Sequence, residues 1–280
     1  MFTGLKIKPR HIIFFVLTVL FFICLRVFVL DIFYIPSKSM YPALKPGDYI
    51  VVDKLKYGPR VIKIWKFLSE KEVRFKRVKG YGAVEKGDII VFNQPVFLMD
   101  EGYYGTVLVK RCYGIPGDTI LITYDQLQGF NPRRHNKNQE EFQQSITKIE
   151  NTDLFPFDTN LNWTPLNYGP LFNPGRGKTI ELTKSNLLHF NYLLKLEGLD
   201  IVINGDSVIL NNLYPRSYTF KNNYYFMLGD NYMYSQDSRY WGFLPEKNII
   251  GKVEFILFSL DPNLPWFKKF RWNRFFKSNV

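Results

Sequence analysis

An apolar run near the N-terminus constrains this chain more than any other feature of its sequence. Residues 12–30 read IIFFVLTVLFFICLRVFVL and contain one charged residue, Arg26. At about 1.5 Å of rise per residue, a helix of this length just crosses a bilayer hydrocarbon core of about 30 Å. Arg26 lies within about a turn of the far end, where its long side chain can reach the interface. The run therefore predicts a transmembrane anchor over residues 12–30.

The residues on either side of this run predict how it is oriented in the membrane and that it is not cleaved off. Residues 1–11 contain three basic and no acidic side chains, and such an end stays in the cytoplasm under the positive-inside rule. The chain from Asp31 onward would then lie outside. The alternative is a cleaved signal peptide, but its apolar region is usually about 7–15 residues long. Residues 31–35 also offer no small-x-small cleavage site, so we expect an uncleaved anchor.

The positive charge of the chain is concentrated at its two ends. Its 280 residues include 37 Lys and Arg against 25 Asp and Glu, a formal net charge of +12. Residues 1–11 contribute three of these charges and residues 262–280, which contain no acid, contribute five. A nucleic-acid-binding protein more often carries basic residues across a folded face. We therefore expect membrane lipid, and no nucleic acid, as the partner of the charged ends.

The C-terminal end has a composition typical of a membrane interface. Residues 265–277 alternate aromatic rings with lysine and arginine. Such interleaving also suits single-stranded nucleic acid. Behind a membrane anchor, rings at headgroup depth with cations toward anionic lipid are the better interpretation.

The body of the chain has the pattern of a mainly β protein. Short apolar runs such as residues 49–52, 88–92, 119–122 and 252–257 are bounded by Gly, Pro, Asn or Asp. A content of 46% hydrophobic and 18% aromatic residues excludes a mostly disordered chain. Residues 125–175 are polar and rich in Pro, Asn and Gly, which indicates loops of an inserted subdomain. Residues 184–197 predict a short helix with Ser185 as a possible cap.

The residue inventory excludes several kinds of site. Two cysteines are too few for a disulfide-stabilised small fold or for a cysteine-based zinc site. The three histidines are scattered along the sequence, which disfavours a histidine metal cluster. The sequence has no phosphate-binding Gly-rich loop, no His-Glu-x-x-His and no Gly-x-Ser-x-Gly. We therefore expect neither a metal nor another cofactor.

Two segments contain residue types suited to nucleophilic catalysis. Ser37 and Ser39 flank one residue in a proline-bounded loop directly after the anchor, although most such serine pairs are solvated turn residues. Lys110 ends an apolar run; if its side chain is buried, its pKa falls and it can act as a general base toward a serine. The alternative is a lysine on the solvated face of a strand, which strand alternation alone favours.

A third segment, residues 227–242, is dense in hydrogen-bonding side chains and has neither a helical nor a strand period. Asp237 and Arg239 can form an ion pair there if the backbone is extended. The alternative is a polar loop held by its own aspartates and asparagines.

Four segments in this order behind an anchor resemble type I signal peptidase, a family of Ser/Lys proteases also called leader peptidases. They are residues 35–54, 86–92, 108–120 and 227–253. The stretches around residues 57–60 and 168–170 further resemble the versions found in Bacteroidetes-type bacteria. The resemblance implies a mainly β fold: one N-terminal transmembrane helix, a signal-peptidase-type catalytic core and an inserted, irregular β-rich subdomain.

The resemblance also implies roles for individual residues. Ser39 matches the nucleophile and Lys110 the general base. Ser37 matches the hydroxyl that forms the oxyanion hole with the Ser39 amide. Ser235 matches the serine that orients the lysine. Two further residues match a supporting pair, Asp237 and Arg239.

Two positions depart from the pattern of the family. Tyr232 stands where arginine is usual, and Ala43 stands where threonine is common. Both lie beside the expected dyad, so the departures bear on local geometry and rate more than on the type of reaction.

The predicted organisation and function follow together. We expect a cytoplasmic basic end (1–11), the anchor (12–30), a first core part (31–120), an inserted subdomain (121–222), a second core part (223–261) and an interface tail (262–280). The protein would sit in the bacterial inner membrane with one span and its catalytic part on the extracytoplasmic side. There it would remove signal peptides from exported preproteins.

Three other functions stay open at this point. One is a Ser/Lys peptidase of another branch, such as a pilin-maturation type or a self-cleaving repressor. The second is a membrane-tethered scaffold with little activity, although both members of the expected dyad are present. The third is an anchored nucleic-acid binder, which the near-neutral body disfavours.

Overall fold

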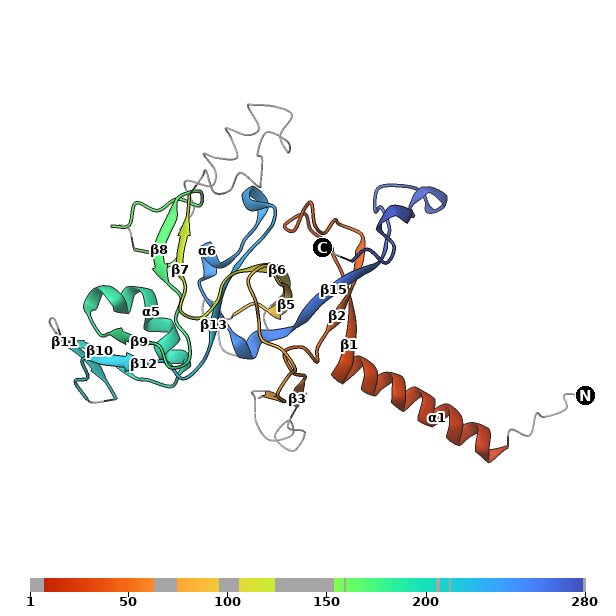
Figure 1. Cartoon of the computed structure of the whole chain (residues 1–280), viewed down its shortest axis with the longest axis horizontal. Helices are drawn as coiled ribbons and strands as arrows, with labels where there is room; N and C mark the ends of the chain where they lie inside the picture. The colour runs from red at the N-terminus through yellow and green to blue at the C-terminus, as the bar shows by residue number, and fades with distance from the viewer. Residues whose placement is uncertain are drawn as a thin grey trace, which may run out of the picture. The chain divides into compact units, whose positions relative to one another are not determined.

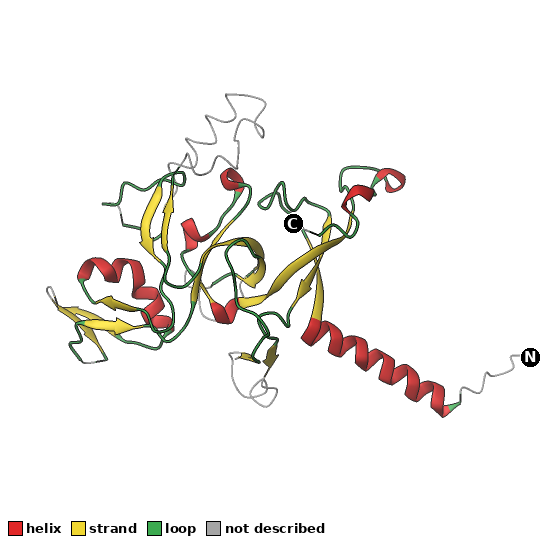
Figure 2. Ribbon diagram, in the orientation of Figure 1, coloured by secondary structure: helices red, strands yellow, loops and turns green. Residues whose placement is uncertain are grey.

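Strands dominate the computed structural model of the chain, which describes residues 8–62, 75–95, 106–123, 154–158, 160–204, 207–211 and 213–278 (Figures 1 and 2). Its strand pairs are antiparallel, which confirms the mainly β prediction. The chain divides into unit 1, residues 1–34, 48–83 and 250–280, and unit 2, residues 35–47 and 84–249. The domain boundaries proposed from the sequence stay a prediction.

Unit 1 contains the N-terminal helix α1 (Pro9–Cys24), which continues through a π-helical turn, Leu25–Val29, into β1. Strand β2 lies between β1 and β15, and β3 pairs with β4. The bounds are β1 (Leu30–Tyr34), β2 (Asp48–Asp53), β3 (Arg60–Ile62), β4 (Phe75–Arg77) and β15 (Ile249–Ser259), followed by the 3-10 helices Trp266–Lys268 and Trp272–Arg274.

The apolar run of the sequence forms one helix, as predicted. The segment Pro9–Val29 is long and apolar enough to cross a membrane. Every residue of α1 is at least partly exposed, including the rings of Phe14 and Phe22. A helix of a soluble core would bury one apolar stripe. A helix that is apolar and exposed all round instead fits a span covered by lipid.

Lys54, at the end of β2, ties the far end of this helix to the sheet of unit 1. Its Nζ donates to the Arg26 carbonyl at 2.8 Å and to Asp31 Oδ2 at 2.7 Å. Its backbone N–H donates to the Val29 carbonyl at 2.9 Å. A cation at a helix C-terminus satisfies carbonyls that lack an intrahelical partner and complements the helix dipole. Lys54 therefore fixes the direction in which the chain leaves the helix.

Replacement of Lys54 by Met is expected to destabilise unit 1 by about 1–2 kcal/mol, the usual worth of charge-assisted hydrogen bonds that are only partly buried. Denaturant unfolding of the detergent-solubilised chain measures this loss. Lys79→Met is the matched control, because Lys79 is an exposed lysine of the same unit. Equal unfolding midpoints for the two variants would contradict the capping role.

Unit 2 contains four adjacent strands, in the order β5 (Ile89–Asn93), β6 (Val107–Gly114), β13 (Tyr224–Leu228) and β14 (Leu244–Pro245). The register places Ile90 opposite Lys110, and Leu228 opposite Arg111. Strand β6 therefore lies between β5 and β13. Lys110 pairs with the buried strand β5, and the next residue, Arg111, pairs with β13, which leads into residues 229–237.

The rest of unit 2 is irregular and β-rich, as the predicted insertion requires. Its described residues form three two-stranded pairs and helix α5 (Lys184–Leu196), which lies against β10 (Figure 1). Thr183, not Ser185, caps α5, because its side chain accepts from the Asn186 N–H. The remaining bounds are β7 (Thr119–Ile122), β8 (Tyr168–Phe172), β9 (Thr179–Glu181), β10 (Ile201–Asn204), β11 (Ser207–Leu210), β12 (Ser217–Thr219), a 3-10 helix Tyr232–Tyr234, α6 (Ser238–Trp241) and a 3-10 helix Glu246–Asn248.

The core of this unit is aromatic and aliphatic. Helix α5 buries Leu187, Phe190, Leu193 and Leu194, which recur at the three- and four-residue spacing of one helix face. Side chains of β7, β8 and β13 belong to the same cluster, in which the Phe226 ring packs against the rings of Tyr168 and Phe243. This packing holds β13, and with it the segment that follows β13, in a fixed position.

Candidate active site

Ser39 lies in a short, well-anchored loop of unit 2. The ends of the loop meet where the Gly47 N–H donates to the Ile35 carbonyl at 2.9 Å. The next side chain, Met40, is buried and fixes the backbone at the serine. Ser37 Oγ lies 3.3 Å from Ser39 Oγ, so the two predicted serines are neighbours in space.

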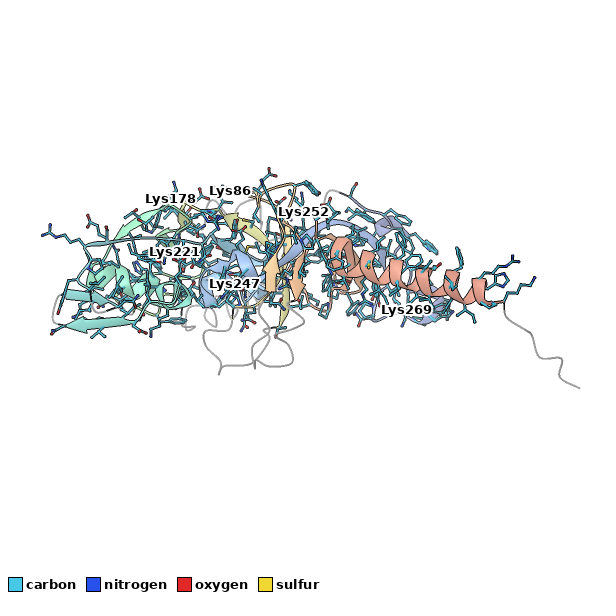
Figure 3. All side chains as sticks on the ribbon, turned by 90° about the horizontal axis from the view of Figure 1, so that it is seen from below. Lys86, Lys178, Lys221, Lys247, Lys252 and Lys269 are labelled. Carbon is cyan, nitrogen blue, oxygen red and sulfur yellow. The ribbon has the colours of Figure 1, made fainter. Side chains whose placement is uncertain are left out.

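Lys110 is buried, in contrast to the other lysines whose exposure the structure describes. Its residue is 3% exposed, whereas lysines such as Lys86 and Lys178 are exposed at the surface (Figure 3). The alternative of a solvated strand position is therefore wrong. Its Nζ donates to Ser39 Oγ at 2.8 Å across 71 positions of sequence. The structure thus brings together the two residues predicted as nucleophile and base.

Burial also changes the protonation of this lysine. Removal from water lowers the pKa of Lys110 below the ordinary lysine value, because the charged form loses hydration. The Asp237 carboxylate raises that pKa, the Arg239 guanidinium lowers it and Asp230 raises it. Burial is the largest of these effects, so the neutral amine, which can accept a proton, is favoured relative to a solvated lysine.

Asp237 and Arg239 form the predicted ion pair, and both side chains are fully buried. Arg239 Nε donates to Asp237 Oδ1 at 2.8 Å, and its Nη2 donates to Oδ2 at 3.0 Å. Asp237 Oδ2 also accepts from the Gly229 N–H at 3.0 Å. The pair therefore holds the segment after β13 in place, and the alternative of a polar loop held by its own aspartates also describes this segment.

Ser235 lies in the same buried region. A side chain at Gly229 would clash with Ser235 Oγ and with the Ser39 carbonyl, so glycine lets these two segments approach closely. Ser235 Oγ makes no hydrogen bond within the part of the chain that the structure describes. Its predicted role in orienting Lys110 stays a prediction.

The described residues contain no group of three or more His, Cys, Asp or Glu side chains that could hold a metal ion.

Comparison with known proteins decides the family. A sequence profile described as "Signal peptidase, peptidase S26" matches residues 9–258. The chain belongs to this family.

Individual relatives agree. Signal peptidase I of Buchnera aphidicola subsp. Baizongia pistaciae is 34% identical over 257 residues, which cover 88% of this chain and 75% of the relative. Signal peptidase I of Pseudomonas aeruginosa is 29% identical over 259 residues, covering 88% and 72%. That of Helicobacter pylori strain 26695 is 29% identical over 282 residues, covering 90% and 86%. The chain is therefore a serine peptidase of the S26 family, with an N-terminal membrane anchor.

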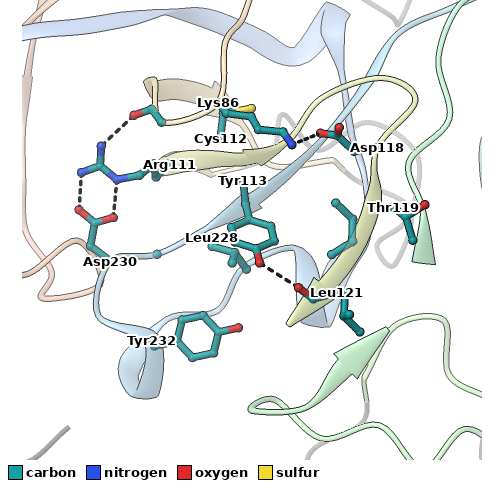
Figure 4. Close-up of a pocket in the computed structure, with 13 residues that line it drawn as sticks. Lys86, Arg111, Cys112, Tyr113, Asp118, Thr119, Leu121, Leu228, Asp230 and Tyr232 are labelled. Carbon is teal, nitrogen blue, oxygen red and sulfur yellow. Dashed lines mark hydrogen bonds and ion pairs between the residues drawn. The ribbon is translucent and has the colours of Figure 1, made fainter. Parts of the chain in front are cut away.

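Two contributions to this signal peptidase site escaped the sequence analysis. Asn231 donates from its backbone to the Ser39 carbonyl and from its Nδ2 to the Lys38 carbonyl, both at 2.9 Å. Arg111 and Asp230 form a bidentate pair with two bonds of 2.7 Å (Figure 4). The available signal was sequence position: Arg111 follows the candidate base, and Asp230 and Asn231 follow Gly229.

Proposed function

We propose that this chain removes N-terminal signal peptides from exported preproteins, with Ser39 as nucleophile and Lys110 as general base. The observation that carries the proposal is the 2.8 Å contact between Lys110 Nζ and Ser39 Oγ in a buried setting. Burial favours the neutral amine, and the contact distance permits direct proton transfer.

Acylation transfers one proton and forms one bond. Ser39 Oγ attacks the carbonyl carbon of the scissile peptide bond while neutral Lys110 accepts the hydroxyl proton. The carbonyl electron pair moves onto oxygen. When the tetrahedral intermediate collapses, the carbon–nitrogen bond breaks and Lys110 returns the proton to the leaving amine. The products are the free mature protein and an ester of the signal peptide on Ser39.

Ser37 is placed to support the intermediate. Its hydroxyl, 3.3 Å from Ser39 Oγ, can donate to the developing oxyanion together with the Ser39 N–H. Loss of one such donor costs about 3 kcal/mol of transition-state stabilisation. Ser235 is buried beside Gly229 and Ser39, and its proposed role is to orient the Lys110 amine.

Deacylation repeats the proton transfers with water. Lys110 accepts a proton from a water molecule that attacks the ester carbonyl carbon. The bond between that carbon and Ser39 Oγ breaks, and Ser39 recovers its proton from Lys110. The signal peptide leaves as a carboxylic acid that releases its proton to solvent, and the enzyme is restored.

The orientation in the membrane follows from charge and chain length. The basic residues at the start of the chain, Lys6, Lys8 and Arg10, favour an N-terminus in the cytoplasm of a bacterium, with the rest of the chain outside the inner membrane. Ser39 lies nine positions after Leu30, so the nucleophile follows closely on the end of the span. This suits a preprotein whose own apolar segment remains in the bilayer.

The C-terminal segment supplies a second lipid contact. Trp266, Phe267, Trp272 and Phe276 are each at least 70% exposed. The segment is nevertheless ordered, because the Arg274 guanidinium forms a buried pair with Asp48. Exposed rings among cations suit the headgroup region of an anionic membrane.

A fluorescence measurement tests this lipid contact in the full chain. In proteoliposomes of anionic lipid with brominated acyl chains, we expect strong quenching of the native tryptophan emission. The double variant Trp266→Phe/Trp272→Phe should lose about half or more of the quenched signal, because these rings lie at the depth where lipid contact occurs. Trp163→Phe is the matched control, since Trp163 packs on Tyr168 within unit 2. Equal quenching in both variants would remove the lipid assignment.

One experiment tests the proposed function itself. The detergent-solubilised chain is mixed with a preprotein, and the new N-terminus is identified by mass spectrometry. We expect one cut at the end of the signal peptide, and no cut with Ser39→Ala. Cleavage by Ser39→Ala at the wild-type rate would overturn the proposal, and a wild-type chain without activity would favour a tethered scaffold.

A further inference from the structure

Unit 2 contains a cavity of about 540 Å³ beside the proposed catalytic residues. Strand β6 contributes Arg111 and Tyr113 to its wall, and the segment after β13 contributes Gly229 and Tyr232 (Figure 4). Lys110 does not line the cavity, although its neighbour Arg111 does. The cavity therefore reaches strand β6 next to the catalytic lysine without reaching the lysine itself.

Tyr232 stands between this cavity and the buried arginine. It lines the cavity, yet its residue is only 5% exposed. Its ring lies 3.7 Å from Arg239 Cζ, in cation–π contact. Its backbone carbonyl accepts from Arg239 Nη2 at 2.8 Å. The guanidinium is thus covered by the ring on one face and held by Asp237 at its edge.

The hydroxyl of Tyr232 takes no part in this arrangement. It is buried and has no hydrogen-bond partner among the residues that the structure describes. A buried hydroxyl without a partner is unfavourable, so it does not explain a tyrosine at this position. The useful part of the side chain is the ring.

The covered arginine is connected to the reacting groups. Arg239 pairs with Asp237, and Asp237 accepts from the Gly229 N–H. Gly229 in turn packs against Ser235 and against the Ser39 carbonyl. Removal of the Tyr232 ring would open a path for water from the cavity to this buried pair.

We infer that Tyr232 is a positioning residue whose ring excludes cavity water from the Asp237–Arg239 pair and keeps the surroundings of Lys110 dry. The inference rests on the proposed role of Lys110 as general base. Water behind the pair would hydrate the Lys110 ammonium and screen Arg239, and both effects raise the pKa of Lys110. Screening of Asp237 and Asp230 acts in the opposite direction, but burial is the largest effect on this lysine.

The test is the pH profile of kcat for preprotein cleavage in three variants. In Tyr232→Leu, which lacks the ring, we expect the rising limb to move to higher pH with little change in KM. For each pH unit by which the limb shifts, kcat at a pH below the limb falls about tenfold, and activity recovers at higher pH. Tyr232→Phe, which keeps the ring, should retain the wild-type profile. So should Tyr234→Ala, which removes an exposed ring from the same 3-10 helix.

The contrary results are equally distinct. The inference would be overturned if kcat of Tyr232→Leu rose at the same pH as in the wild type, or if Tyr232→Phe showed the same shift as Tyr232→Leu. If Tyr232→Leu does not fold, Tyr232→Met provides the same comparison with a more flexible side chain that also lacks the ring. Activity of Ser39→Ala would instead overturn the proposed function, so the two failures can be told apart.

Discussion

Replacement of Lys110 by Met is expected to lower kcat for preprotein cleavage by about 10³- to 10⁵-fold, the range found when the base of a nucleophile–base pair is removed. Methionine fills much of the buried space but cannot accept the proton of Ser39 Oγ, 2.8 Å away in the native chain. KM should change little, because the lysine acts on the reaction and not on substrate binding. Initial rates in detergent at fixed pH give both constants.

The pH profile adds a signature that a merely structural lysine would not produce. The active form of Lys110 is neutral, so wild-type kcat should rise with pH through the pKa of Lys110 and level off above it. Because burial lowers that pKa, the rise lies below the ordinary lysine range. The residual activity of Lys110→Met should lack this limb. Lys86→Met, at an exposed lysine of the same unit, should keep both rate and limb; an unchanged rate in Lys110→Met would exclude the lysine as base.

The largest expected effect on stability comes from Asp237→Ala. This change leaves the Arg239 guanidinium buried without its carboxylate, and breaking a buried pair in this way costs about 3–5 kcal/mol. It also frees the Gly229 N–H, which now donates to Asp237. Denaturant unfolding of the solubilised chain measures the loss, and activity should fall with it because Gly229 packs against Ser39.

An exposed ion pair of the same unit provides the control. Lys86 Nζ lies 3.1 Å from Asp118 Oδ2, but the Lys86 side chain is 58% exposed. Lys86→Ala should therefore cost less than about 1 kcal/mol. Similar losses in Asp237→Ala and Lys86→Ala would show that the buried pair does not have the structural role described above.

Some of this architecture is readable from the sequence, because local composition determines it. The anchor follows from 19 consecutive residues with one charge, and antiparallel strands follow from short apolar runs between turn residues. Ser39 and Lys110 are identifiable as candidates because of the segments around them. Strand alternation alone favoured an exposed Lys110, and only the fold shows that this side chain is buried.

The contacts that hold the site together depend on tertiary structure. Tyr232 stands as a departure from the family pattern in the sequence, and nothing local indicates that its ring covers Arg239. The residues that cap the helices also depend on tertiary structure. Lys54 donates to the carbonyl of Arg26, 28 positions earlier, and a local sequence pattern cannot predict a contact between residues so far apart in the chain. Thr183 and Ser185 are both acceptable caps by residue type, and backbone geometry selects Thr183.

The covalent intermediate is the most direct test of the central claim that Ser39 carries the acyl group. The solubilised chain is mixed with a preprotein, and the reaction is quenched with acid within the first turnover. After digestion, the mass of the peptide containing Ser39 is measured by mass spectrometry. We predict that this peptide carries the signal peptide as an ester on Ser39, and that the adduct is absent from Ser39→Ala. An adduct on another residue, or turnover by Ser39→Ala without any adduct, would contradict the mechanism.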